Sequence, residues 1–377
     1  CGRLIAPLVI YLKSRGVRVS GSDAKIFPPV DSLLEGEGIK FHCEFDAENV
    51  PKEVDLILVG AWVKRGNPEL EAVLSRGQHY ENAARWLGGT LFREGRNITI
   101  AGTNGKTTTS GMLAHILKEA GKDVGWMIGG ELPSLETRAR FDPCDLRVIE
   151  ADEFISGFAD MNPKFFYYAP HAAAITNISH DHHNTFAAPV QYFQLFQEFV
   201  NTVPAGRPLV LSADDPGCKW LYIPPVGIDV RRVGFSPKSD QRITGFKALA
   251  EKTRFKFLGA DFEINSIGRM NVRNAAIAIS LAQSYGVRPQ SAARALRSFE
   301  LPAGRQEVIF KSKAVVAMKD EAYHPSALAE LLPALRASYP RRRLVMVFQP
   351  RYTGPKNEGF QQRWVEPLSN ADLLLMA

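Results

Sequence analysis

The feature that most constrains this chain is a short glycine-containing segment, GTNGKTTT, which begins at Gly102. It follows an apolar stretch, Asn97–Ala101, that predicts a strand, and it precedes an amphipathic stretch, Ser110–Ala120, that predicts a helix. Glycines between a strand and a helix let backbone N–H groups surround a phosphate, and the helix N-terminus adds partial positive charge. The segment therefore predicts a nucleotide-binding α/β domain.

Two side chains of this segment have the chemistry that a nucleotide site requires. Lys106 reaches the β- and γ-phosphates in such loops, and the hydroxyl of Thr107 can hold Mg²⁺. The spacing departs from G-x-x-x-x-G-K-[ST], since only two residues separate Gly102 from Gly105. The alternative is a glycine turn with an exposed lysine, and in either case we expect Lys106 to be exposed with little packing role. The residues expected around the phosphates are Gly102, Thr103, Asn104, Gly105, Lys106, Thr107 and Thr108.

Strand-like and helix-like stretches alternate along the rest of the chain, which is typical of α/β domains with mostly parallel sheets. The length of 377 residues suggests two or three domains. We expect a Rossmann-like N-terminal domain over residues 1–95 and a central P-loop ATPase-like domain over residues 96–298. A second Rossmann-like domain is expected over residues 299–377.

The C-terminal domain is expected to be incomplete. Strand Ala314–Met318, helix Ser326–Ser338 and strand Leu344–Phe348 together predict a βαβ unit. The chain begins with Cys1 rather than Met and stops within the apolar run Ala371–Ala377. We therefore expect further segments beyond both ends.

Composition and charge exclude several classes of protein. The formal net charge of +6 is mild and the basic residues are spread along the chain, which argues against a nucleic-acid partner. No apolar run reaches the ~18–20 residues of a membrane span, and no signal peptide is evident. The four cysteines form no CxxC pair, which argues against a disulfide framework or a zinc ribbon. We expect a cytoplasmic enzyme for anionic small molecules, with no membrane partner.

Acidic and histidine side chains follow two further apolar strands. Glu150 lies in the stretch Leu146–Ala151, and a carboxylate at the carboxyl end of a strand faces the ligand crevice of an α/β sheet. An acidic helix cap is the alternative. His182 follows the stretch Ala172–Thr176, and four of the eight histidines gather in this region. Chemistry alone therefore suggests a zinc site there.

These motifs resemble those of the Mur ligase family, ATP-dependent ligases that build the peptidoglycan peptide. Gly102–Thr109 is similar to the family's GT-[HN]-GKTTT, Glu150–Glu153 to its EADE, and Thr176–Asn184 to its TNI-x-x-DH-x-D/N. The resemblance implies a three-domain fold with ATP and Mg²⁺ as cofactors. It also implies that Glu150 helps to hold one Mg²⁺ and that His182 is a ligand of a second.

Later motifs resemble the family's nucleotide contacts. The segment GRMNVRNA from Gly268 implies that Asn271 hydrogen-bonds the adenine edge, with a helix N-cap as the alternative. Arg305 would reach the ATP phosphates when the third domain closes, with a solvated linker arginine as the alternative. The third-domain motif implies that Asp320 contacts the ATP ribose or phosphate region. It also implies that His324 orients the incoming amine or a phosphate.

Five positions depart from the family's patterns. Met270 and Tyr323 each replace a histidine, Lys319 replaces an aspartate, and Glu321 replaces an aromatic residue. Gln197 stands where many members carry a carbamoylated lysine. Because of the replacements at Lys319, Tyr323 and Met270, a catalytically silent Mur-like nucleotide-binding protein is an alternative. A generic P-loop ATPase switch is another, against which the full set of motifs argues.

Substrate contacts are expected at both ends of the chain. Ser22 and Asp23 follow the strand Val17–Ser20, where an acidic residue commonly binds a nucleoside ribose or base edge. Arg351 follows the strand Leu344–Phe348 and suits an acceptor carboxylate, with an ordinary surface arginine as the alternative.

The segment around Asp23 resembles one branch of the family, which works in peptidoglycan recycling. That branch joins UDP-N-acetylmuramate, through an acyl phosphate, to L-Ala-γ-D-Glu-meso-diaminopimelate. L-Alanine is the alternative acceptor, and we expect a monomer or weak dimer. A tripeptide with three carboxylates suits the dense cationic set of the third domain: Arg336, Arg341, Arg342, Arg343, Arg351 and Lys356.

Overall fold

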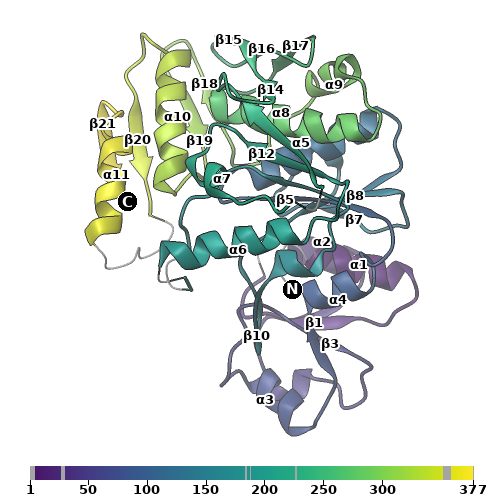
Figure 1. The fold of residues 1–377 in the computed structure, drawn as a ribbon. Coiled ribbons are helices and arrows are strands. Elements are labelled where there is room, and N and C mark those ends of the chain that lie inside the picture. Colours follow the sequence, from purple (N-terminus) through teal and green to yellow (C-terminus); the bar gives the residue numbers. More distant parts are fainter. Residues whose placement is uncertain are drawn as a thin grey trace.

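The computed structural model describes residues 5–26, 30–182, 185–186, 188–225, 227–350 and 358–376. Its largest feature is an eight-stranded sheet in the middle of the molecule (Figure 1). The strand order is β14-β13-β12-β11-β5-β8-β6-β7, and neighbours are parallel except β6 with β7. These strands are β5 (Arg96–Ala101), β6 (Val124–Met127), β7 (Ala139–Arg140), β8 (Leu146–Glu150), β11 (Ala172–Ile175), β12 (Pro208–Ser212), β13 (Asp229–Gly234) and β14 (Gln241–Arg242). The expected α/β class is confirmed.

The sheet is buried on both faces because alternate residues of each central strand point to opposite sides. Ile98, Ile100 and Ala174 pack in one apolar cluster, whereas Ala173 and Ile175 pack in the other. Figure 1 shows α5 and α8 on one side of the sheet and α6 on the other. The helices of the two layers are α5 (Lys106–Glu119), α8 (Arg269–Ser284) and α9 (Pro289–Leu296) on one side, and α6 (Pro189–Asn201) on the other. Strands covered on both faces are continuously apolar, which is why they were predictable.

The helix after the glycine segment begins earlier than predicted. α5 begins at Lys106, not at Ser110, so Lys106 and Thr107 lie in its first turn. Gly105 caps the helix with a φ of 84°, a left-handed conformation that favours glycine. A Cβ at Gly105 would also lie 2.6 Å from Oδ1 of Asn274. The free N–H groups of the first turn therefore face the segment Gly102–Gly105.

The N-terminal segment, residues 5–95, forms two parallel strand pairs, β1 with β2 and β3 with β4. β1 begins at Ser20, later than the predicted strand, so Ser22 lies on the strand and Asp23 follows it. The elements are α1 (Ile5–Ser14), β1 (Ser20–Ser22), α2 (Val30–Gly36), β2 (Lys40–His42), η1 (Ala47–Asn49), β3 (Ile57–Val59), α3 (Pro68–Ser75), β4 (Tyr80–Asn82) and α4 (Ala83–Gly89). Pro68 opens α3, and Asn67 caps it.

An antiparallel sheet that the sequence analysis missed covers the α8–α9 layer. It consists of β15 (Thr244–Ala248), β16 (Thr253–Phe257) and β17 (Ala260–Ile264). Along β16 and β17, buried residues alternate with more exposed ones. The buried side chains of Phe255, Phe257 and Phe262 pack in the same core cluster as α8 and α9. This alternation of apolar and polar residues is the sequence signal that could have predicted the sheet. The remaining central elements are η2 (Pro133–Leu135), β9 (Ile155–Gly157), β10 (Asp160–Pro163), η3 (Lys164–Tyr167) and α7 (Pro216–Trp220).

In the C-terminal segment, residues 299–376, the predicted βαβ unit of residues 314–348 is wrong. The strand near residue 316 does not pair with the strand near residue 346, because β19 pairs antiparallel with β18 and β20 pairs parallel with β21. The βαβ unit is therefore β20–α11–β21. The elements are β18 (Glu307–Lys311), β19 (Val316–Lys319), α10 (Pro325–Ser338), β20 (Val345–Phe348), α11 (Glu358–Leu368) and β21 (Leu373–Met376). No helix among the described residues is long and apolar enough to cross a membrane.

The α6 layer provides a test of this packing. Phe196 is fully buried and contacts the rings of Tyr192 and Phe165. We expect Phe196→Ala to lower the free energy of unfolding by about 3–5 kcal/mol, since it leaves a cavity beneath the sheet. Val190→Ala, on the same helix at 60% exposure, is the control and should change stability by about 0.5 kcal/mol or less. Urea unfolding measures both, and equal effects would contradict the assigned packing.

Candidate functional site

The candidate site lies where three neighbouring strands end. β11, β5 and β8 are adjacent and parallel, so their carboxyl ends open at one edge of the sheet. The phosphate loop, defined here as residues 102–108, follows β5. Acidic residues follow β8, and the segment with His182 follows β11. Gly102 permits close approach of the β11 segment, because a Cβ there would lie 2.1 Å from Oγ1 of Thr176.

Lys106 is held inside the site rather than extended into solvent. Its Nζ donates to the Gly102 carbonyl at 2.6 Å and to Oε2 of Glu153 at 2.7 Å. Only 14% of the Lys106 side chain is exposed, and Glu153 is fully buried. The expectation of an exposed lysine with little packing role is therefore wrong. Burial opposes the charged form, but the charges of Glu153 and Asp152 outweigh it and raise the pKa of Lys106.

Thr107 and Glu150 form the first candidate metal pair. Oγ1 of Thr107 donates to Oε1 of Glu150 at 2.9 Å, and the Gly129 N–H donates to the other carboxylate oxygen at 2.7 Å. Burial raises the pKa of Glu150, while the Gly129 hydrogen bond and Lys106 oppose this shift. β9 follows β8, so no helix begins at Glu150, and the interpretation of this residue as a helix cap is wrong.

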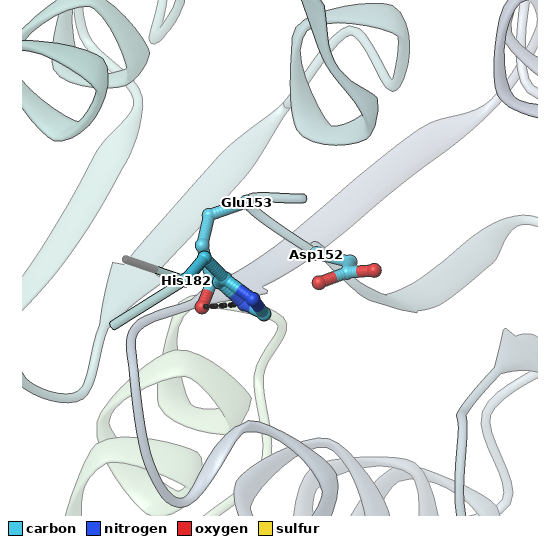
Figure 2. Close-up of side chains that lie close together, drawn as sticks. All are labelled: Asp152, Glu153 and His182. Carbon is cyan, nitrogen blue, oxygen red and sulfur yellow. Dashed lines mark ion pairs between the residues drawn. The ribbon is translucent and has the colours of Figure 1, made fainter. Parts of the chain in front are cut away.

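Asp152, Glu153 and His182 form a second cluster, drawn in Figure 2. One potential ligand atom from each residue lies within 4.8 Å of those of the other two. Nε2 of His182 is 3.5 Å from Oε1 of Glu153. Burial alone would lower the pKa of His182. Glu153 and the neighbouring aspartates outweigh burial, so the pKa of His182 is raised. Despite burial, Lys164 and Lys106 lower the pKa of Asp152 to about 2.

The ligand set fits a hard divalent cation. The two groups supply three carboxylates and a hydroxyl against a single imidazole, and oxygen ligands suit Mg²⁺ better than zinc. His180, the neighbouring histidine, is directed elsewhere, since its Nε2 contacts the Phe186 carbonyl at 2.8 Å. His183 lies outside the described residues. The sequence analysis did not name Asp152 and Glu153 as candidate ligands, although they lie two and three residues after Glu150 in the EADE motif.

The rest of the phosphate loop is fixed by the β11 segment. Thr103 Oγ1 donates to the Ser179 carbonyl at 2.9 Å and lies 3.1 Å from the Tyr192 hydroxyl. Tyr192 donates in turn to Oε1 of Glu153 at 2.9 Å. The Asn104 N–H donates to the Asn177 side chain, and Thr108 is buried in the first turn of α5. Tyr192 is a contact that no sequence motif indicated.

Asn271 and Asn274 both lie on α8, and Asn274 packs against the phosphate loop. Gly268 is the N-cap of α8, so the interpretation of Asn271 as a helix N-cap is wrong. Asn271 is buried, and its Nδ2 donates to the Ile267 carbonyl at 3.1 Å. Asn274, one turn later, is the residue that packs against Gly105.

Asp320 and Gln306 connect the C-terminal segment to the rest. The two carboxylate oxygens of Asp320 accept the N–H groups of Gln306 and Ala322 at 2.9 and 2.7 Å. Burial raises the pKa of Asp320, and these hydrogen bonds and the Arg305 charge oppose it. The Gln306 side chain both accepts from and donates to the backbone of Ile267. Asp320 therefore fixes the junction that carries Arg305.

The C-terminal segment is docked onto the site. His324 caps α10, and its Nε2 contacts the His180 carbonyl at 3.1 Å. The Tyr323 hydroxyl donates to Asp181 at 3.0 Å, so this departure from the family pattern has a cross-segment partner. Asn104 of the phosphate loop donates to Ser326 at 3.0 Å. Burial lowers the pKa of His324.

The two predicted substrate positions at the ends of the chain have different outcomes. Ser22 hydrogen-bonds the carboxylate of Glu69, and the Asp23 N–H donates to the His42 carbonyl. Ser22 is the last residue of β1 and Asp23 follows it, so both lie at the carboxyl end of the strand, and their contacts with a ligand stay a prediction. Arg351 lies outside the described residues.

Comparisons with known proteins cover nearly the whole chain. The family model "Mur ligase middle domain" matches residues 100–282, and "Mur ligase family, catalytic domain" matches residues 1–93. The UDP-N-acetylmuramate–L-alanyl-γ-D-glutamyl-meso-2,6-diaminoheptandioate ligase of Escherichia coli is 30% identical over 93% of this chain and 77% of its own. The UDP-N-acetylmuramate–L-alanine ligase of Halorhodospira halophila is 34% identical over 97% of this chain and 75% of its own. The crystal structure of a murein peptide ligase from Psychrobacter arcticus is 27% identical with a TM-score of 0.77, covering 100% of this chain and 82% of that chain.

The buried Lys106–Glu153 pair predicts a double effect of mutation. Lys106→Ala should abolish ATP-dependent turnover and lower the free energy of unfolding by about 3–5 kcal/mol, because Glu153 stays buried without its cation. Lys118→Ala removes an exposed lysine of the same helix and should change neither the turnover nor the free energy of unfolding. Phosphate release and urea unfolding measure the two effects. Normal turnover in Lys106→Ala would refute the phosphate loop, and unchanged stability would refute the buried pair.

Proposed function

Because the chain belongs to the Mur ligase family, whose members are ATP-dependent amide ligases, we propose that it acts on UDP-N-acetylmuramate and a peptide. It would join the carboxylate of UDP-N-acetylmuramate to the amine of L-Ala-γ-D-Glu-meso-diaminopimelate, in peptidoglycan recycling. The printed name of the Escherichia coli relative supports this choice of substrates. The observation that carries the proposal is the convergence of the phosphate loop, its lysine and three carboxylates at the ends of β5, β8 and β11.

The proposed reaction has two steps. The carboxylate of UDP-N-acetylmuramate takes the γ-phosphoryl group of ATP, which gives an acyl phosphate and ADP. The free α-amine of the acceptor then attacks the acyl carbon, the C–N bond forms, and phosphate leaves. Neither step requires a covalent bond to the protein, so catalysis consists mainly of positioning and charge neutralisation.

Lys106 and Arg305 are the proposed cations of this reaction. Lys106 already lies in the phosphate loop, next to two carbonyl groups that a phosphate would compete with. Arg305 follows Gly304 at the junction, and its guanidinium suits a phosphate approached from the C-terminal segment. Asn271 is proposed for the adenine edge and Asp320 for the ribose or phosphate region.

Magnesium is the proposed metal, held by Thr107, Glu150 and His182. The closeness of Asp152 and Glu153 to His182 supports adding these two carboxylates to the proposed ligands. Glu153 is buried and Glu150 and Asp152 are half-buried, so these three carboxylates would repel the triphosphate of ATP if nothing compensated their charge. Bound Mg²⁺ supplies that compensation and polarises the phosphoryl oxygens.

The substrate ends are proposed to lie at opposite sides of the phosphate loop. Ser22 and Asp23 would contact the uridine part, and His324 and Arg351 the acceptor. Two arginines of the C-terminal segment already have backbone partners. Arg336 donates to the Arg342 carbonyl, and Arg342 donates to the Ala314 carbonyl. These two arginines brace the backbone and are not proposed as acceptor contacts.

A second candidate acceptor is L-alanine. It is favoured by the 34% identity to the Halorhodospira halophila ligase, whose printed name contains this amino acid. The domain boundaries near residues 95 and 298, a cytoplasmic location and a monomeric or weakly dimeric state belong to the same proposal.

A panel of amine acceptors tests the choice between them. With UDP-N-acetylmuramate, ATP and Mg²⁺, we expect kcat/KM for the tripeptide to exceed that for L-alanine by at least ~10-fold, as one charge-assisted contact to its extra carboxylates would give. Phosphate release measures both. A higher value for L-alanine would replace the tripeptide by alanine. No release with any acceptor would favour a catalytically silent nucleotide-binding protein.

Removal of a metal ligand tests the magnesium site. We expect Glu150→Gln to raise the Mg²⁺ concentration for half-maximal activity by at least ~10-fold, because a charged ligand is lost. Glu136→Gln changes an exposed carboxylate and should leave this concentration unchanged. Zinc that stays bound in stoichiometric amount after dialysis would contradict the proposal.

A further inference from the structure

An exposed tryptophan lies at the carboxyl end of an N-terminal strand. Trp62 follows β3, which ends at Val59, and is 71% exposed to solvent. Part of its ring is covered by Phe154, at a centroid distance of 4.9 Å and an interplanar angle of 29°. Trp62 therefore presents a large, accessible aromatic surface whose orientation is fixed from beneath.

The stack leads directly to the candidate metal cluster. Phe154 lies 5.0 Å from the ring of His182, measured between centroids. The ammonium of Lys164 lies 5.5 Å from the Phe154 centroid and also pairs with Asp152. Trp62, Phe154 and His182 thus form a continuous column from the N-terminal segment to the residues of Figure 2.

The loop that carries Trp62 connects β3 to α3 over residues 60–67, and contacts hold it near both ends. Gly157 of β9 touches the loop so closely that a Cβ there would lie 3.3 Å from Cα of Ala61. At the other end, Glu69 in the first turn of α3 hydrogen-bonds Ser22. The loop therefore joins the proposed uridine contact to the catalytic cluster.

We propose that Trp62 is the stacking surface for the pyranose ring of the UDP-sugar substrate. This inference rests on the proposed function and adds a specificity-determining residue to it. In UDP-N-acetylmuramate the hexose lies between the uridine diphosphate and the lactyl carboxylate. If Ser22 and Asp23 hold the uridine end and the carboxylate reaches the phosphate loop, the hexose must pass the loop that carries Trp62.

The chemistry of a pyranose suits this surface. One face of the ring presents C–H groups, which pack on an aromatic ring while the hydroxyl groups stay hydrated at the edge. The Phe154 contact holds the indole in place before the substrate arrives, so little conformational freedom is lost on binding. A uracil ring would also stack on an indole, and the test must separate the two.

Binding measurements without turnover provide the test. Calorimetry would give the Kd of UDP-N-acetylmuramate and of UDP for the full chain and for Trp62→Ala. We expect the Kd of UDP-N-acetylmuramate to rise by about 5- to 10-fold, and that of UDP to change by less than about 2-fold, since UDP lacks the sugar. Trp62→Phe should restore binding to within about 3-fold of the original.

Matched controls separate this role from a structural one. Trp220→Ala removes another exposed tryptophan, at 83% exposure on α7, and should leave both Kd values unchanged. The KM for ATP should be unaffected by either variant, and the unfolding midpoint of Trp62→Ala should match that of the original chain.

Three outcomes would overturn the inference. An unchanged Kd for UDP-N-acetylmuramate in Trp62→Ala shows that the ring is not used, while the proposed function stands. An equal loss for UDP and UDP-N-acetylmuramate assigns Trp62 to the nucleotide instead of the sugar. Absence of UDP-N-acetylmuramate binding by the original chain refutes the proposed function itself.

Discussion

The site depends on the ion pair between Lys106 and Glu153. A fully buried carboxylate is costly unless it is paired and hydrogen-bonded, and here Lys106, Tyr192 and His182 surround it. The same lysine holds two carbonyl groups of the phosphate loop, so the pair links the loop after β5 to the acidic residues after β8. Binding of a triphosphate would offer Lys106 a second anionic partner besides Glu153.

The order of the strands explains why these groups meet. β5, β8 and β11 are neighbours in the sheet although other elements separate them along the chain, and parallel strands bring their carboxyl ends to one edge. The apolar layers of α5, α8 and α6 fix that sheet rigidly, so the polar groups at its edge keep their positions. A rigid frame with reactive groups on its loops is the arrangement that positioning catalysis requires.

The C-terminal segment completes the site by docking, and its unusual residues take part. Tyr323 departs from the family pattern, yet its hydroxyl donates to Asp181, next to His182 of the candidate metal cluster. Arg273 of α8 pairs with Glu330 of α10, which adds a charged contact across the same junction. Asp320 accepts the N–H groups of Gln306 and Ala322, so it shapes the junction between the C-terminal segment and the rest of the chain.

The sequence by itself determined the α/β class, the central strands β5, β8 and β11 and the glycine segment between β5 and α5, because apolar runs and glycine spacing are local signals. It also singled out Glu150, the last residue of β8, and His182, in the segment after β11, whose roles as metal ligands stay predictions. It failed where the answer depends on contacts between distant residues. The burial of Lys106, the Tyr192 brace and the Trp62–Phe154–His182 column join residues that only the folded chain brings together. The pairing of β19 with β18 was likewise decided by tertiary structure, since strand propensity does not specify a partner.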